Sequence, residues 1–280
     1  MLSARRTTAA GFALMISAIP NLAEAQGKLE AAYTISLARF PIGSVTTSSE
    51  FGDGRYNIKT SGRASGVMRI LASGEGTLSA NGEIRDGRPA PIEFIARTTT
   101  DDVTADAKLT FENGNVVTMT ASAPEPSPDR IELTEAHRQG VVDPLTALLI
   151  PASESGDPLS QAACNRTLPI FDGRRRFDLK LTFKKMDKVK ADKGYAGPVV
   201  VCAVAFQPIA GYRTSSPMVK YLADGRDIEI ALAPVAGTGV LAPFRLSVSN
   251  MLGNLTVNAT RFEVTAPASV RAGTTTGQAQ

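Results

Sequence analysis

Tryptophan is absent from this 280-residue chain, which has only one histidine and two cysteines. The lone His137 excludes a site built from several histidines, and two cysteines without closely spaced further ligands do not form a zinc site. His137 also has no Ser or Cys near it in a nucleophile setting, so we interpret it as a loop residue. Sugar-cleaving enzymes commonly stack their substrates on aromatic rings, and the lack of Trp argues against that class. We therefore predict no metal, no cofactor and no catalytic residue that can be named.

An apolar run long enough to span a bilayer is absent as well. The longest run, from Ala9 to Ile19, has about eleven residues, roughly half of what a membrane-crossing helix needs. It lies between Arg5-Arg6 and Ala23-Glu24-Ala25, and this order is typical of a cleavable secretory signal. The residues after Arg6 lack the twin-arginine consensus, which favours the ordinary secretory route. We expect residues 1–25 to be removed after Ala25, leaving an exported chain with no lipidated Cys and no integral membrane span.

Charge of one sign is not in large excess, since the formal net charge is +3 and removal of Arg5, Arg6 and Glu24 leaves +2. This balance offers no overall electrostatic footprint for nucleic acid. The segment from Arg166 to Lys193 differs, with ten Lys or Arg against four Asp. It predicts either contact with an anionic lipid, lipopolysaccharide or acidic protein surface, or solvated strands whose lysines discourage edge pairing. The candidate contact residues are Arg174, Arg175, Arg176, Lys180, Lys184 and Lys185.

Alternation of apolar and polar residues dominates the rest of the sequence, and a period of two is typical of half-buried strands. The segment from Phe177 to Lys184 is the clearest, because Phe and Leu alternate there with Asp, Thr and Lys. Turns are predicted at Asp53-Gly54, Asn81-Gly82 and Asn113-Gly114, and also at Gly74-Glu75-Gly76. Further strands are predicted over 29–37, 42–51, 55–63, 75–80, 92–98, 102–111, 116–121, 198–206, 227–232, 244–248 and 254–260.

Three alternating prolines, Pro124, Pro126 and Pro128, interrupt this pattern and predict a linker or crossing loop. After it, the segment from Asp143 to Ile150 has a capping Asp, a Pro at the first helical position and an apolar face. It predicts one short helix packed in the concave side of a sheet. The whole pattern predicts a mainly β fold, either one large curved antiparallel sheet or an open, rolled β-barrel, with a two-sheet β-sandwich as the alternative. We expect one such domain over 26–265 and a disordered tail over 266–280.

Carboxylates and cysteines are the remaining candidates for chemistry. Two facing carboxylates would suit a glycoside hydrolase, whereas solvent-facing and turn positions are the simpler interpretation of the acidic residues on two predicted hairpins. Cys164 and Cys202 lie in the exported part, where oxidising surroundings favour a disulfide over a reactive thiol. Such a bridge closes a loop of about 38 residues and is worth on the order of 4 kcal/mol. The acidic residues in question are Asp101, Asp102 and Asp106 on one hairpin and Asp224, Asp227 and Glu229 on the other.

Several motifs occur in an order that resembles one protein family. They are Ile42-Gly43, the segment from Val142 to Leu148, Cys164 followed by Phe171-Asp172-Gly173-Arg174-Arg175-Arg176-Phe177-Asp178-Leu179, Val201-Cys202, and Pro208-Ile209-Ala210-Gly211-Tyr212. In this order the chain resembles the bacterial domain of unknown function 3108 over about Tyr33 to Val264, and the Asp-Gly-Arg-Arg turn looks most like the alphaproteobacterial branch. The resemblance implies a periplasmic location, a curved antiparallel sheet or open barrel with a helix, and no established activity or catalytic residue.

Two main classes of function follow from these predictions. The favoured one is a non-catalytic periplasmic module that supports the cell envelope by binding an apolar or amphipathic ligand, or a protein partner, in the concave face of its sheet. The alternative is a hydrolase that acts on envelope polysaccharide or ester through acidic residues. A structural interaction protein with a filled interior and an exposed apolar patch is a third reading. The expected partners are therefore a lipid, another envelope component or another envelope protein.

Overall fold

The computed structural model describes residues 26–65, 74–101, 103–152, 158–224, 227–250 and 253–265. The predicted signal segment over 1–25, the predicted tail over 266–280 and Asp102 lie outside the described residues. Between these segments the described chain is mainly β, as predicted.

All of the described strands belong to one sheet of fifteen strands, and neighbours in the main path are antiparallel. The path runs β7-β6-β5-β4-β3-β2-β1-β15-β14-β13-β12-β10-β9, while β8 pairs with β14 and β11 with β15. The first seven strands are β1 (Gly27–Leu37), β2 (Phe40–Gly52), β3 (Arg55–Ala64), β4 (Gly74–Arg85), β5 (Arg88–Thr100), β6 (Val103–Glu112) and β7 (Asn115–Ala121). The others are β8 (Ile150–Pro151), β9 (Arg166–Phe171), β10 (Arg176–Lys190), β11 (Lys193–Gly194), β12 (Ala196–Ala210), β13 (Ile228–Val235), β14 (Val240–Asn250) and β15 (Gly253–Thr265).

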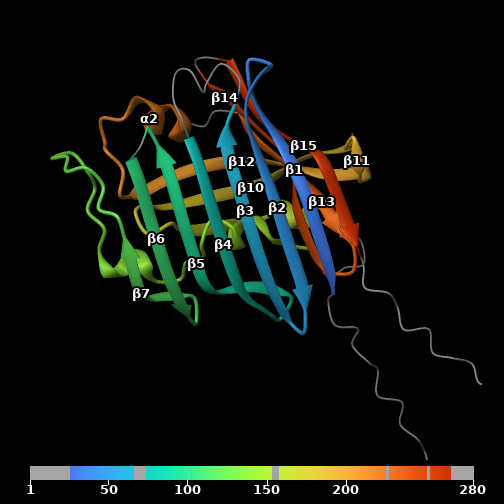
Figure 1. The fold of residues 1–280 in the computed structure, drawn as a ribbon, viewed down its shortest axis with the longest axis horizontal. Coiled ribbons are helices and arrows are strands. Elements are labelled where there is room, and N and C mark those ends of the chain that lie inside the picture. Colours follow the sequence, from blue (N-terminus) through green and yellow to red (C-terminus); the bar gives the residue numbers. More distant parts are fainter. Residues whose placement is uncertain are drawn as a thin grey trace, which may run out of the picture.

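The sheet curves so that its two halves face each other. In Figure 1 the blue-to-green strands β1 to β7 form one layer, and β10, β12 and β13 cross behind them. The pairing of β1 with β15 joins the halves into a continuous ladder, so the predicted curved antiparallel sheet is confirmed and a sandwich of two separate sheets is not what forms. The ends of the ladder do not pair with each other. A connecting segment spans them, since Val141 N donates to Gly114 O at 2.8 Å and Val142 pairs with Ile170.

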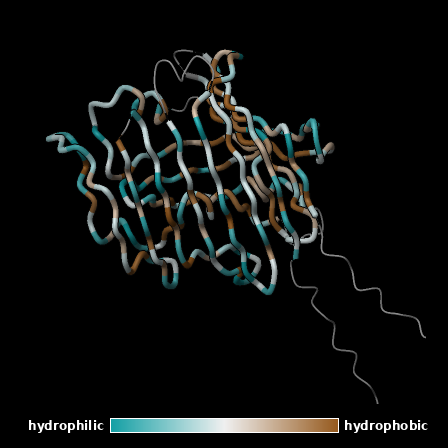
Figure 2. Tube along the Cα trace, viewed as in Figure 1, coloured by the Kyte–Doolittle hydropathy of each residue, from teal (hydrophilic) through white to brown (hydrophobic). Residues whose placement is uncertain are grey.

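The core fills the space between these two layers. On β6 the alternating Ala107, Leu109 and Phe111 are buried, and Lys108 points outward to an ion pair with Glu93. Hydrophilic and hydrophobic residues also alternate along strands of the front layer in Figure 2, whereas β12 and β13 contain continuous buried runs. Full burial of one such Leu or Phe side chain contributes about 1.5–3 kcal/mol to the stability of the fold. The alternation therefore determines which face of each strand packs into the core.

Two of the predicted turns are confirmed and two are wrong. Asp53-Gly54 and Asn113-Gly114 have positive φ angles between paired strands, as predicted for tight hairpins. Asn81-Gly82 instead lies inside β4, and the hairpin turns five residues later at Asp86-Gly87. Gly82 is needed in the strand because a Cβ there would lie 2.2 Å from Ala90 O and 2.3 Å from the Tyr56 hydroxyl. The segment Gly74-Glu75-Gly76 is also part of β4, where it pairs with β3 and β5, and it is not a turn.

The predicted helix over Asp143 to Ile150 is wrong in type and length. Only a 3₁₀ turn, η2 (Thr146–Leu148), forms there, and the chain then extends into β8, which pairs with Leu241 and Val240 of β14. Ile150 pairs with Leu241 as a strand residue, so the helical turn ends before it. The predicted placement is nevertheless found, because Leu145 and Leu149 are buried in the core. Two more 3₁₀ turns, η1 (Glu135–Arg138) and η3 (Gln161–Cys164), and one α-helix, α2 (Pro217–Ala223), complete the described elements.

The predicted disulfide is present in the structure. Cys164 at the end of η3 and Cys202 in β12 lie with their Cα atoms 5.4 Å apart, and both side chains are fully buried. The bridge fixes the loop that carries η3 against the sheet, where Leu159 and Leu181 belong to the same hydrophobic cluster.

Candidate functional site

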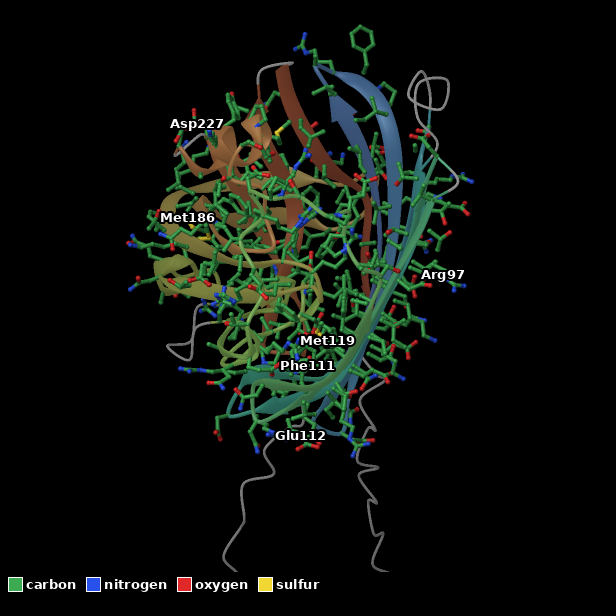
Figure 3. All side chains as sticks on the ribbon, turned by 90° about the vertical axis from the view of Figure 1, so that its left-hand side faces the viewer. Arg97, Phe111, Glu112, Met119, Met186 and Asp227 are labelled. Carbon is green, nitrogen blue, oxygen red and sulfur yellow. A yellow bond between two sulfur atoms is a disulfide. The ribbon has the colours of Figure 1, made fainter. Side chains whose placement is uncertain are left out.

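A cavity of about 350 Å³ lies between the two halves of the sheet. Aliphatic side chains that alternate along single strands, such as Leu179 and Leu181 on β10 or Ile228 and Ile230 on β13, form one wall. The opposite wall comes from β1 to β3, and the η2 segment contributes a third side. Figure 3 shows the side chains that converge between the layers. The lining residues include Leu29, Tyr33, Val45, Ile58, Leu145, Leu148, Leu149, Leu168, Val204, Leu246, Val248 and Val257.

Polar side chains are few on the cavity wall, and Tyr33, Thr47, Thr60 and Arg245 are already bonded. The Tyr33 hydroxyl donates to Pro243 O at 2.8 Å, and burial raises the pKa of this phenol well above its ordinary value. The Thr47 and Thr60 hydroxyls bond each other at 3.0 Å. Arg245 is the one charged residue among the described lining residues, and its Nη2 lies 3.0 Å from Asp187. The cavity is therefore suited to an apolar group with one polar end.

Asp143 forms a buried polar network beside this cavity. Its Oδ1 accepts from Leu145 N at 2.9 Å and from Thr146 N at 3.0 Å, as a capping carboxylate does. Its Oδ2 accepts from the Thr146 hydroxyl at 2.5 Å, and that hydroxyl also bonds the Tyr56 hydroxyl at 2.8 Å. The network ties the η2 segment to β3 and thereby holds one side of the cavity in place.

Stability is expected to fall as the pH rises through the titration of Asp143. Burial raises the pKa of this carboxyl from 3.8 to about 6 in the folded chain. Between these values the folded state binds more protons than the unfolded state, so the stabilisation is complete below about pH 4 and lost above pH 6. Its size is on the order of 3 kcal/mol. Urea denaturation of the wild type and of Asp143→Asn measures it.

The comparison with Asp143→Asn isolates this titration, because the amide keeps the capping oxygen and carries no charge. The variant should gain stability relative to the wild type as the pH is raised from 4 to 7. A difference between the two proteins that does not change with pH, or that changes in the opposite direction, would contradict the burial of an ionisable Asp143.

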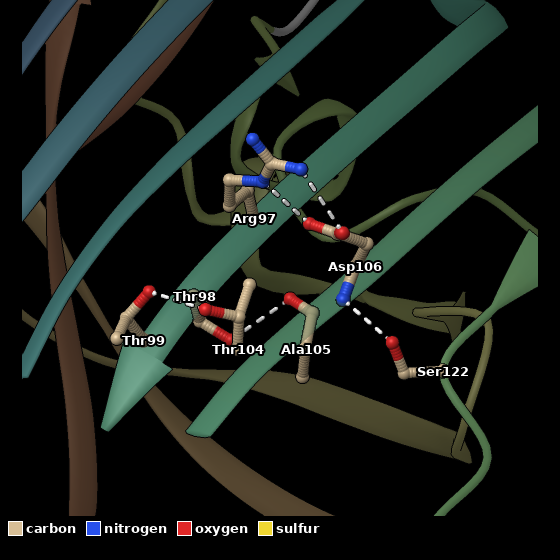
Figure 4. A network of polar contacts seen from close by, with 7 residues as sticks. All are labelled: Arg97, Thr98, Thr99, Thr104, Ala105, Asp106 and Ser122. Carbon is tan, nitrogen blue, oxygen red and sulfur yellow. Dashed lines mark hydrogen bonds and ion pairs between the residues drawn. The ribbon is translucent and has the colours of Figure 1, made fainter. Parts of the chain in front are cut away.

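The other sequence candidates that the structure describes lie outside the lining of the apolar cavity. His137 is in η1, and its Nδ1 accepts a hydrogen bond from Thr134 N at 3.0 Å, so the ring serves as a local cap. Asp106 lies on the exposed outer face of the sheet, where Arg97 Nε donates to it at 2.8 Å (Figure 4). That ion pair holds the pKa of Asp106 below its usual range, whereas a general acid needs a raised value. Glu229 is paired with Lys184.

Asp224 and Asp227 also lie outside the cavity lining. Asp224 forms the C-cap of α2, and Asp227 is exposed next to the start of β13. In the described ranges no three His, Cys, Asp or Glu side chains gather closely enough to hold a metal ion. Within the same ranges no helix is sufficiently long and apolar to cross a membrane.

The six basic candidates separate into two groups. One group forms ion pairs, Arg176 with Asp178 at 2.5 Å, Lys184 with Glu229 at 2.5 Å and Lys185 with Asp187 at 3.7 Å. The other group consists of Arg174 and Arg175 in the turn before β10 and Lys180, which is exposed on β10. The six residues therefore do not share one surface role.

The family model described as "Protein of unknown function (DUF3108)" matches residues 32–260. The chain belongs to this family. The resemblance inferred from the motifs is thus confirmed, and the assignment to an alphaproteobacterial branch stays a prediction. A crystal structure of a β-barrel-like protein of domain of unknown function DUF1849 from Brucella abortus is similar to this DUF3108 chain, with a TM-score of 0.49 and 12% identity over 86% of this chain and 99% of that one. No curated protein matches the chain.

Proposed function

We propose that this DUF3108 protein is a non-catalytic periplasmic module that supports the cell envelope by binding an apolar or amphipathic ligand in its cavity. The cavity itself carries the proposal, because its volume of about 350 Å³ is walled by aliphatic side chains from both halves of the sheet. Pockets for small molecules commonly enclose about 300–1,000 Å³ and are mostly apolar with a few polar groups. A single acyl chain fits this description.

The polar end of the ligand is expected near Arg245. This residue is the charged member of the described lining, and its side chain is about one third exposed, so it lies where the apolar walls meet solvent. An anionic or hydroxylated head group beside Arg245 would keep its hydration while the tail is buried.

Export to the periplasm is supported by two independent features. Residues 1–25 have the order of a cleavable signal, and Cys164 and Cys202 form a buried disulfide of the kind that oxidising compartments favour.

Titration with a dansyl-labelled fatty acid tests the binding proposal. We expect a saturable rise in dansyl fluorescence with one probe bound per chain, because the probe leaves water for the cavity. An unlabelled fatty acid should reverse the rise. A signal that grows without saturation, or that the unlabelled acid does not displace, would show surface adsorption and contradict the proposal.

A further inference from the structure

A second hollow, of about 760 Å³, lies outside the apolar cavity and has a different chemistry. It is formed by the proline-containing linker, the turn before β10, the end of β12 with the turn that follows, and α2. The linker and α2 come from distant parts of the chain, but Thr214 N donates to Asp129 O at 3.0 Å and Ser215 N to the Asp129 carboxylate at 2.8 Å. We call this hollow the arginine groove, after Arg130, Arg174, Arg175 and Arg213, which line it.

A tight turn presents two of these arginines. Asp172 Oδ1 accepts from Arg174 N at 2.8 Å and from Arg175 N at 2.6 Å, which fixes the turn from within. Gly211 has a φ of +82°, and a Cβ there would lie only 2.1 Å from Arg174 O. Glycine at this position therefore allows the two turns to pack together. These are the Asp-Gly-Arg-Arg and Ala-Gly-Tyr motifs of the sequence, and the apolar cavity makes no use of them.

The other two arginines face each other across an isolated antiparallel bridge between Arg130 and Arg213. The Arg130 guanidinium is held in place by backbone carbonyls, with Nη1 donating to Gly211 O at 2.7 Å and Nη2 to Glu125 O at 3.1 Å. The Arg130 guanidinium is thus positioned by main-chain carbonyls, which carry no formal charge to neutralise it.

The charge balance of the groove favours an anion. Glu125 is the one carboxylate residue among the described lining residues, and within the described chain none of the four arginines forms an ion pair. The buried Nε atoms of Arg130 and Arg174 have no hydrogen-bond partner there. Arg175 lies over the Tyr212 ring, 5.7 Å from its centroid, which holds its guanidinium without neutralising it.

We propose that the arginine groove binds a phosphate group. Guanidinium groups donate paired hydrogen bonds that match phosphate oxygens, and partly buried arginines without carboxylate partners lack such an acceptor. Phe206, Met218 and Leu222 line the same groove and offer contact to an apolar part of the ligand. The phosphate can therefore belong to a free phosphate ester or to a phospholipid head group. This proposal does not depend on ligand binding in the apolar cavity.

Isothermal titration calorimetry at low ionic strength tests the proposal on the exported chain with inorganic phosphate, glycerol phosphate and a short-chain phosphatidic acid below its micellar concentration. Arg175→Ala/Arg213→Ala removes two exposed guanidinium groups, and Lys184→Ala is the matched control because it removes a cation outside the groove. The double variant should weaken phosphate binding by about a hundredfold, or about tenfold per charge-assisted contact. The control should change it by less than about twofold.

The three ligands distinguish a lipid head group from a free phosphate ester. Tighter binding of the phosphatidic acid than of glycerol phosphate identifies a lipid head group, and equal binding identifies a free ester. Absence of binding to all three ligands, or equal weakening in the control and the double variant, would overturn the proposal. Arg213→Ala alone, which alters one exposed side chain, replaces the double variant if circular dichroism shows that the latter is unfolded. Failure of the dansyl titration would leave this result unaffected.

Discussion

Val45→Phe is expected to weaken binding of the dansyl-labelled fatty acid by roughly 50-fold. Val45 is a half-buried residue of β2 whose side chain lines the apolar cavity. The larger ring displaces about three methylene groups of the ligand tail, and each buried methylene is worth about 0.8 kcal/mol. The dissociation constant from the fluorescence titration measures the effect.

Val117→Phe is the matched control for this change. It adds the same ring to β7, where Val117 is 48% exposed and does not line the cavity. Its affinity for the probe should equal that of the wild type. If both variants bind as tightly as the wild type, the ligand does not occupy the space beside Val45, and the proposed site is wrong.

Removal of the disulfide by Cys164→Ala/Cys202→Ala is expected to lower the free energy of unfolding by about 4 kcal/mol. The bridge closes a loop of 38 residues, and its loss releases the unfolded chain from that constraint. Because both cysteines are fully buried, the variant also loses packing against Leu159 and Leu181 in the same cluster. Urea denaturation at constant pH measures the change.

Dithiothreitol provides the control for the disulfide. The reductant should bring the wild type close to the stability of the alanine variant and leave that variant unaffected. A loss of less than about 1 kcal/mol would mean that the sheet alone fixes the η3 loop, in conflict with the role assigned to the bridge.

The strands could be predicted from the sequence because burial on one face imposes a period of two. The predicted segments over 42–51 and 254–260 lie inside β2 and β15, which differ from them mainly in length. The predicted ends of the strands are less accurate, because hairpin pairing extends each strand beyond the apolar residues that identify it. β9 was missed because Arg166 to Phe171 is too short and mixed in composition to show alternation.

The helical segments η2 and α2 are harder to predict from the sequence than the strands. Asp143 does cap the following turn, but pairing of Ile150 with β14 prevents a longer helix. The α-helix α2 was not predicted, although Ser216 accepts from Val219 N and Pro217 occupies the first turn, as in a standard N-terminus. Its seven residues make only about two turns, which is too short a segment to show a helical period.

The candidate sites depend on residues that are distant in sequence. The walls of the cavity come from both halves of the chain, and no local motif marks them. The charge of the basic segment predicts a contact role for Arg174 and Arg175. It does not distinguish them from Arg176, Lys184 and Lys185, which form ion pairs with carboxylates in the fold. Arg130 and Arg213 were missed because only the folded chain brings them to the same groove.

Native mass spectrometry of the protein, purified without detergent from cells of its own host, tests whether the cavity holds a ligand. We expect a population whose extra mass corresponds to one apolar or amphipathic molecule per chain. That extra mass should be released by organic solvent and should be strongly reduced in Val45→Phe but not in Val117→Phe. A wild-type protein that carries only its own mass, under conditions that preserve bound lipid in a known lipid carrier, would contradict ligand binding in the cavity.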